Sequence, residues 1–260
     1  MMAGKTSGEL NVMREGGAKL AAILKKLLLL AVPGTTLLAL DAVAEKLITE
    51  TGGEASFKTV EGYKWATCLC VNEAVVHGIP TNYPLQKGDI LTIDIGLLYQ
   101  GLHTDTAWTI EVGSGDDFIS VNSLSDKQVF LNAGKKALVA AISEAKDGNR
   151  VGNISKAIQS AVEAAGYSIV RSLVGHGVGQ KLHEAPQVPG FLRGAIEETA
   201  PLAAGMTLAI EVIYAQGAGA VVYNNDDGWT IATRDRSLSA VFEHTIAIAG
   251  DKAEILTGFS

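Results

Sequence analysis

The chain has 260 residues, of which 47 % are hydrophobic and 19 % are charged, so a sizeable core can form and wholesale disorder is excluded. This length fits one large domain or two closely packed halves. The formal net charge is −7, which argues against a basic surface for nucleic acid or for an anionic membrane.

Two helices are predicted in the N-terminal part of the chain. The first ten residues, MMAGKTSGEL, have no apolar stretch of the kind that signal peptides carry. Apolar residues recur at helical spacing over residues 9–31. The most apolar run, LAAILKKLLLLAVPG, contains Lys25 and Lys26 and stops at Pro33, so it is too short and too charged to span a membrane. After Pro33, Thr35 or Thr36 can cap a second helix over residues 37–50, before Gly52 and Gly53.

Two cysteines, Cys68 and Cys70, lie in the apolar run TCLCVN. Residues two apart share one face of a strand, and a disulfide across one intervening residue would be badly distorted. We therefore expect two buried, reduced thiols, a pattern that suits a cytoplasmic protein.

Strands and a second pair of helices are predicted in the rest of the chain. Residues 89–99 and 103–112 form a hairpin around Gly101, and helices are expected over 125–146 and from Asn153 or Ser155 to Gly166. Strands follow over residues 206–214, 228–233 and 241–249. Helices followed by antiparallel strands, twice over, indicate an α+β fold.

An internal duplication is suggested by glycine spacing. Gly34 follows Gly16 by 18 residues, and Gly152 follows Gly134 by the same 18. This predicts one catalytic domain built from two pseudo-symmetric halves, about 9–122 and 123–257, each with antiparallel strands flanked by helices.

Five side chains form the candidate reactive site, and most of them interrupt apolar strands. Burying unpaired carboxylates costs several kcal/mol each or forces protonation, and a divalent cation removes that conflict. Each residue alone has an ordinary reading as a cap, an ion-pair partner or a structural histidine, so the hypothesis depends on the whole set: Asp94, Asp105, His176, Glu211 and Glu243.

Asp94 and Asp105 are 11 positions apart on the two strands of the hairpin, where they can face each other across the ladder. Four carboxylates match two divalent cations in charge. Oxygen ligands with one imidazole favour Mn, Fe, Co or Zn, and a pair of such ions can activate water for hydrolysis.

Four further histidines lie near these residues. His77 in VVHGIP and His183 in KLHEAP are either substrate-contacting groups that help proton transfer or exposed loop residues. His103 and His244 flank the ligand strands, and strand alternation turns His244 away from the face of Glu243, so neither is assigned a role.

The chain also resembles a known family. The segments VNEAVVHGIP, KGDILTIDIG, GLHTDTAWTIEVG, VGHGVGQKLHEAPQVPGF, GMTLAIEV and DGWTIATRDRSLSAVFEHTIAI occur in this order between Met13 and Thr257. Together they are similar to the type I methionine aminopeptidases, which have the pita-bread metallopeptidase fold. The chain has neither a long insertion in the second half nor a Cys/His-rich N-terminal extension.

The resemblance implies a two-metal site and a reaction. Asp94 would chelate one ion, Asp105 and Glu243 would bridge both, and His176 and Glu211 would complete the other shell, with Glu211 as general base. A metal-bridged hydroxide would attack the scissile carbonyl. His77 and His183 would contact the substrate, and Tyr63 and Trp229 would lie beside the methionine pocket.

The resemblance also implies partners. The substrates would be nascent polypeptides and peptides that begin with methionine followed by a small residue. A transient ribosome contact, a monomeric state and a cytoplasmic location are expected, without nucleic-acid or membrane binding.

The sequence departs from the family pattern around the methionine pocket, at positions that line or border it in relatives: Lys64, Trp65, Leu173, Leu182 and Val212. Two alternatives follow. A related Xaa-Pro aminopeptidase or dipeptidase would share the fold but usually carries an extra N-terminal domain. A non-catalytic binding module is disfavoured because all five ligand positions are filled.

Overall fold

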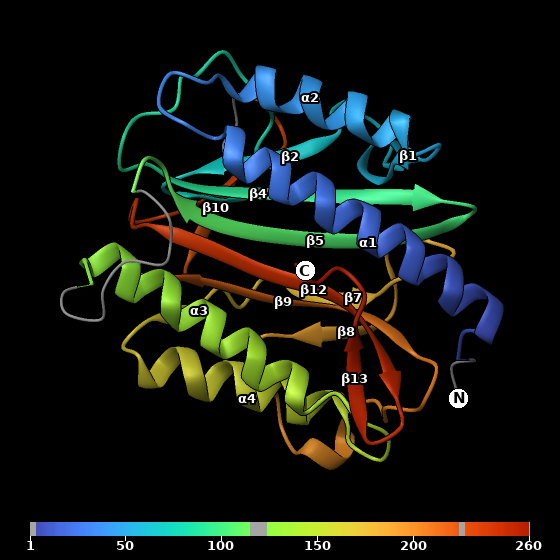
Figure 1. Ribbon diagram of the computed structural model, residues 1–260. Coiled ribbons are helices and arrows are strands. Elements are labelled where there is room, and N and C mark those ends of the chain that lie inside the picture. Colours follow the sequence, from blue (N-terminus) through green and yellow to red (C-terminus); the bar gives the residue numbers. More distant parts are fainter. Residues whose placement is uncertain (1–3, 115–123, 224–226, 260) are drawn as a thin grey trace.

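The computed structural model describes residues 4–114, 124–223 and 227–259, and it has the α+β architecture expected from the sequence. Helices α1 (Ser7–Leu30) and α2 (Leu37–Glu50) cover the strands of the first half, and α3 (Asp126–Ser143) and α4 (Val151–Ala164) cover those of the second (Figure 1). Among the described residues, no helix is long and apolar enough to cross a membrane.

Side-chain caps fix where the helices begin. Thr36 accepts a hydrogen bond from the N–H of Ala39, and α2 has the predicted bounds 37–50. Helix α3 ends at Ser143, three residues before the predicted end at 146. The prediction that Asn153 or Ser155 opens α4 is wrong, because Asn153 lies in the first turn and accepts from the N–H of Arg150, which stands at the cap position.

The first sheet contains β1 (Glu54–Ala55), β2 (Thr67–Val71), β4 (Ile90–Tyr99) and β5 (Leu102–Glu111). Both β1 and β2 pair along one edge of β4, and β5 pairs along the other. The predicted hairpin is confirmed. Its turn has positive φ angles of 48° at Gln100 and 81° at Gly101, the conformation that a tight two-residue hairpin needs.

The second sheet has the order β13 (Lys252–Ile255), β12 (Ser239–Ala249), β9 (Thr207–Ala215), β7 (Val174–Gly177) and β8 (Glu184–Pro189). Strand β6 (Ser168–Ile169) also pairs with β9. Short 3-10 helices cover Ser56–Thr59 and Ile196–Glu198.

A third, small sheet joins β10 (Val221–Tyr223), β11 (Ile231–Thr233) and β3 (Ala74–Val76). The prediction of a strand over 228–233 is therefore wrong for its first half. The carboxylate of Asp227 accepts hydrogen bonds from the N–H groups of Trp229 and Thr230 and holds that stretch in a turn.

The two larger sheets meet where β5 runs beside β12 (Figure 1), and threonine hydroxyls join them. Thr109 Oγ1 donates to the carbonyl oxygen of Val241 and accepts from its N–H. Thr245 Oγ1 does the same for the backbone of Asp105. We call this line of contacts the threonine seam (Thr106, Thr109 and Thr245), and it brings Asp105 beside Glu243. The duplication of the two halves stays a prediction.

Candidate metal centre and active-site cavity

Strand register puts the two aspartates of the hairpin on one face. Asp94 pairs with Ala107 and Asp105 pairs with Gly96, so the two carboxylates are diagonal neighbours. The hairpin turn at Gln100 and Gly101 sets this register, in which Asp105 lies two residues along the strand from Ala107, the direct partner of Asp94.

The second sheet supplies the other three predicted ligands. Glu211 on β9 stands directly opposite Glu243 on β12. His176 on β7 pairs with Ala209, which is two residues from Glu211, so the imidazole shares the face of the glutamates. Like charges placed directly opposite each other destabilise a sheet unless something neutralises them.

All five side chains line one cavity of 610 Å³ between the two sheets. Ligand atoms of Asp105, His176 and Glu243 lie within 4.8 Å of one another. His176 Nε2 lies 3.5 Å from Glu211 Oε1. The five predicted ligands lie between positions 94 and 243 of the sequence. The fold brings all of them to one cavity between the two larger sheets.

The carboxylates have unmet charge and hydrogen-bonding capacity. Asp94 Oδ1 and Glu243 Oε1 are buried without a hydrogen-bond partner among the described residues. Burial raises the pKa of Asp105 to about 7, against an opposing hydrogen bond from the N–H of Thr106. Burial, and then the charges of the neighbouring carboxylates, raise the pKa values of Asp94, Glu211 and Glu243 well above the usual range. Divalent cations fit such a donor set, because they would supply the missing positive charge.

His176 is already oriented as a ligand. Its Nδ1 lies 2.9 Å from the carbonyl oxygen of Gly177, which can only accept, so Nδ1 carries the proton. The lone pair of Nε2 then points toward Glu211. Burial lowers the pKa of His176 to about 4, so the ring is neutral at pH 7, the form that binds a metal ion.

His77 and His183 both line the same cavity and both are exposed at its rim. His77 has a φ of 58°, which turns its ring inward from the bend after β3. The His183 ring centroid lies 4.4 Å from that of His176. Partial burial lowers the pKa values of both, so each is neutral at pH 7 and can donate one hydrogen bond.

One wall of the cavity is apolar. Tyr63 and Trp229 meet edge to face with ring centroids 5.1 Å apart, and the Tyr63 hydroxyl donates to the carbonyl oxygen of Thr67. Cys68 and Leu182 complete this wall. Both thiols are free and buried as predicted, but the place of Cys68 in the wall was missed. The signal was its position on the strand beside Asp94, with which it pairs.

The positions that depart from the family pattern lie in different places. Leu173 and Leu182 line the cavity, and Trp65 packs on Tyr63 at 5.3 Å between ring centroids. Lys64 is exposed. Val212 is fully buried in the core, on the face of β9 opposite to Glu211, so its side chain points away from the cavity.

The remaining histidines lie outside the cavity lining. His244 is buried against Trp108 and its Nδ1 lies 3.1 Å from Thr257 Oγ1, as strand alternation predicts. His103 Nδ1 lies 2.8 Å from Ser56 Oγ, so each ring has a structural partner.

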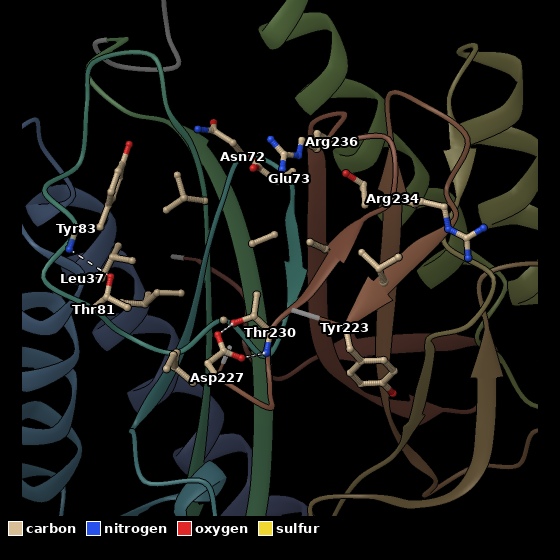
Figure 2. A pocket seen from close by; sticks show the side chains of 18 residues that line it. Leu37, Asn72, Glu73, Thr81, Tyr83, Tyr223, Asp227, Thr230, Arg234 and Arg236 are labelled. Atoms are coloured by element: carbon tan, nitrogen blue, oxygen red, sulfur yellow. Dashed lines mark hydrogen bonds between the residues drawn. The ribbon is translucent and has the colours of Figure 1, made fainter. Parts of the chain in front are cut away.

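A second cavity of 830 Å³ lies on the other side of β3 and β11. Figure 2 shows Arg234 and Arg236 at its edge and Asp227 bonded to Thr230 inside it. None of the five predicted ligands lines it, and neither do His77 or His183. Of these two cavities, the first is therefore the one that the predicted site residues line.

Comparisons with known proteins agree with this geometry. Residues 11–249 match the model of metallopeptidase family M24. The chain is 42 % identical to methionine aminopeptidase 1 of Bacillus subtilis over 253 residues, which are 97 % of this chain and 98 % of that protein. The chain belongs to the type I methionine aminopeptidases.

Solved structures place this methionine aminopeptidase chain in the pita-bread fold. The methionine aminopeptidase of Thermotoga maritima superposes with a TM-score of 0.91 at 38 % identity, and the match covers 99 % of both chains. A prolidase of Pyrococcus horikoshii shares the fold with a TM-score of 0.76 at 21 % identity, but this chain covers only 64 % of it.

Proposed function

We propose that this chain is a metal-dependent aminopeptidase that removes the N-terminal methionine from nascent polypeptides and peptides with a small second residue. The observation that carries the proposal is the convergence of four carboxylates, two buried and two half-buried, and His176 in one cavity, where Asp94 Oδ1 and Glu243 Oε1 lack partners among the described residues. The full-length similarity to methionine aminopeptidases supports the same activity.

The donor set suits two divalent ions chosen from Mn, Fe, Co and Zn. Asp94 and Asp105 would hold them from the first sheet, and His176, Glu211 and Glu243 from the second. When bound, such ions act as Lewis acids that polarise the scissile carbonyl and lower the pKa of water.

The chain's own groups bind and orient the substrate. The apolar wall of Tyr63, Cys68, Leu182 and Trp229 offers burial to the methionine side chain. His77 and His183, neutral at the rim, each offer an N–H to the oxygen on which negative charge develops. The Glu211 carboxylate, which lines the cavity, takes a proton from the attacking water as general base and returns it to the departing amine.

The rim also explains why only an N-terminal residue is processed. Side chains of the cluster and the apolar wall fill the closed end of the cavity, and the histidines stand at its open side. A free α-amine and one side chain fit within, and the rest of the polypeptide leaves past the histidines.

The decisive test is release of methionine from Met-Ala-Ser by protein stripped with a chelator and reloaded with Mn or Co. Reloading restores activity if the proposal is right, and an Xaa-Pro dipeptide panel stays intact. An Asp105→Asn variant should lose activity by about 10³-fold or more, because it removes one of the four negative charges that would hold the ions.

Asp89→Asn is the matched control for this test. Asp89 is as buried as Asp105, with exposures of 7 % and 5 %, but it lies outside the cavity and bonds Tyr83, Gln86 and Asn72. The Asp89→Asn variant should bind metal and release methionine as the wild-type protein does. Metal-loaded wild-type protein that leaves Met-Ala-Ser intact would overturn the function.

Partners and location remain proposals. The buried, free Cys68 and Cys70 support work in the cytoplasm. A transient ribosome contact and a monomeric state stay predictions from the family.

A further inference from the structure

The segment before α1 reaches across the molecule to the active-site cavity. Lys5 Nζ donates to Glu184 Oε2 at 2.8 Å, and the two side chains are only 13 % and 23 % exposed. The backbone N–H of Lys5 also donates to the carbonyl oxygen of Gly205 at 2.7 Å. Lys5 is therefore held at both its backbone and its charge, unlike a lysine on a solvated surface.

The partner of Lys5 closes a short loop, residues 179–184. Glu184 Oε1 accepts the N–H of Lys181 at 3.0 Å, and the carbonyl oxygen of Gly179 accepts the N–H of His103 at 2.7 Å. The Lys5 side chain crosses the start of this loop, where a Cβ on Gly179 would overlap its Cε and Nζ. One carboxylate thus ties the end of the loop to the backbone of Lys181, and Lys5 ties that carboxylate to the N-terminal segment.

This loop carries two residues of the cavity wall. Leu182 is buried among the apolar residues, and His183 stands at the rim with its ring 4.4 Å from that of His176. The His183 side chain has no hydrogen bond within the part of the chain that the structure describes, so its position depends on the backbone that carries it.

We propose that Lys5 is a positioning residue, whose ion pair with Glu184 fixes the 179–184 loop so that the His183 ring stays over the metal centre. The inference rests on the function proposed above. Glu184 also lines the cavity, and the lysine supplies the countercharge of this carboxylate.

Lys5→Met keeps an unbranched side chain one heavy atom shorter than lysine and removes its charge. We expect kcat for Met-Ala-Ser to fall about tenfold or more while KM changes less than about threefold, because a misplaced transition-state group affects the chemical step. Amide hydrogen exchange in residues 179–184 should speed up, since Glu184 loses the partner that holds it. Metal content should be unchanged.

The matched control is Arg14→Met. Arg14 forms an equally close ion pair, 2.7 Å from Glu254, which ties α1 to β13 far from the cavity. This variant should keep the wild-type kcat and the wild-type exchange of residues 179–184, even if it melts at a lower temperature. Equal kcat values for the two variants would overturn the proposal.

A double-mutant cycle with His183→Ala identifies the route. If Lys5 acts through His183, adding Lys5→Met to His183→Ala should lower kcat by less than about twofold. A further tenfold loss in that background would refute the coupling. Amide exchange of residues 179–184 can be measured without enzymatic activity. Unchanged exchange in Lys5→Met would therefore overturn the anchoring by Lys5, even if the wild-type protein released no methionine. Failure of the wild-type protein to release methionine would by itself overturn only the proposed function.

Discussion

Asp105 shows how the site depends on its missing positive charge. In an unfolded chain an aspartate releases its proton near pH 3.8, whereas burial in the folded, metal-free protein raises the pKa of Asp105 to about 7. Between these values the unfolded state binds fewer protons, so the folded state loses stability as pH rises. The raised pKa values of Asp94, Glu211 and Glu243 act in the same direction.

The buried histidines change the stability of the folded state with pH in the opposite direction, and they do so over a lower pH range than the carboxylates. The pKa of His176 falls from 6.5 to about 4 on burial, so its contribution to stability is complete above pH 6.5 and is lost as pH falls. Above pH 6.5 the contribution of His176 no longer changes with pH, whereas those of the carboxylates still do. This separates the two effects on the pH axis.

We therefore expect the Tm of chelator-treated protein to fall by about 5 °C or more between about pH 6.5 and 8.5. Scanning calorimetry at several pH values measures this. With Mn present the slope should disappear or reverse, since ionised carboxylates bind the cation and protons compete with it. Asp105→Asn in chelator should show a flatter slope. A metal-free Tm that rises over this range would contradict the assignment.

For single residues, the sequence indicated which side chains carry the chemistry, but it did not indicate which other side chains they contact. Carboxylates inside apolar strands, as at Glu211 and Glu243, carry a local signal because charge in a buried strand needs an explanation. Cys68 had no such signal, since a small thiol is at home in any core. The pairing of Lys5 with Glu184 joins residues 179 positions apart, and no periodicity predicts it.

At the scale of elements, helix α3 depends on a glycine at its closest approach to the second sheet. A Cβ on Gly134 would lie 2.6 Å from Tyr214 Cε1 and would also overlap Phe242. The Tyr214 hydroxyl donates to the carbonyl oxygen of Phe130 and accepts from the N–H of Gly134, so the ring cannot swing away without losing both bonds.

Gly134→Ala should therefore destabilise the fold by about 1–3 kcal/mol, the usual cost of overpacking a core. Urea unfolding monitored by circular dichroism measures this. Gly8→Ala in α1 is the control, because its nearest neighbour is Thr6 Oγ1 at 4.0 Å and alanine favours the helix by up to about 1 kcal/mol. Similar unfolding midpoints for the two variants would show that α3 can shift on the sheet.

Elements were predictable where local chemistry decides them. Thr36 and the glycines after Glu50 fixed α2, and Gly101 fixed the hairpin. Residues 228–230 read as strand by composition, but the Asp227 carboxylate competes for their N–H groups and makes a turn. The alternation of apolar and polar residues does not show that a carboxylate will accept these hydrogen bonds, so it predicted a strand where the chain forms a turn.

At the scale of the whole molecule, the proposed ligands are divided between two sheets, which the threonine seam joins beside the packing of Trp108 on Phe242. Asp94 and Asp105 belong to the first sheet, and the other three belong to the second. Thr109 Oγ1 lies at the seam within hydrogen-bond distance of Thr92 Oγ1 as well as both polar groups of Val241. Because Val241 is two residues from Glu243, the seam sets the distance between the two groups of ligands.

Thr109→Val removes that hydroxyl at constant volume and leaves the backbone N–H and carbonyl of Val241 without partners. We expect a loss of about 1–3 kcal/mol in the free energy of unfolding. Weaker Mn binding should accompany it in calorimetric titration, because ions must then draw the sheets together themselves.

Thr104→Val is the matched control: Thr104 lies on the same strand, equally buried, and its hydroxyl has no partner among the described residues. That variant should be neutral or slightly stabilising with unchanged Mn affinity. If the two valine variants bind Mn equally well, the seam does not set the geometry of the site, and the helices and cores alone hold the two halves in register.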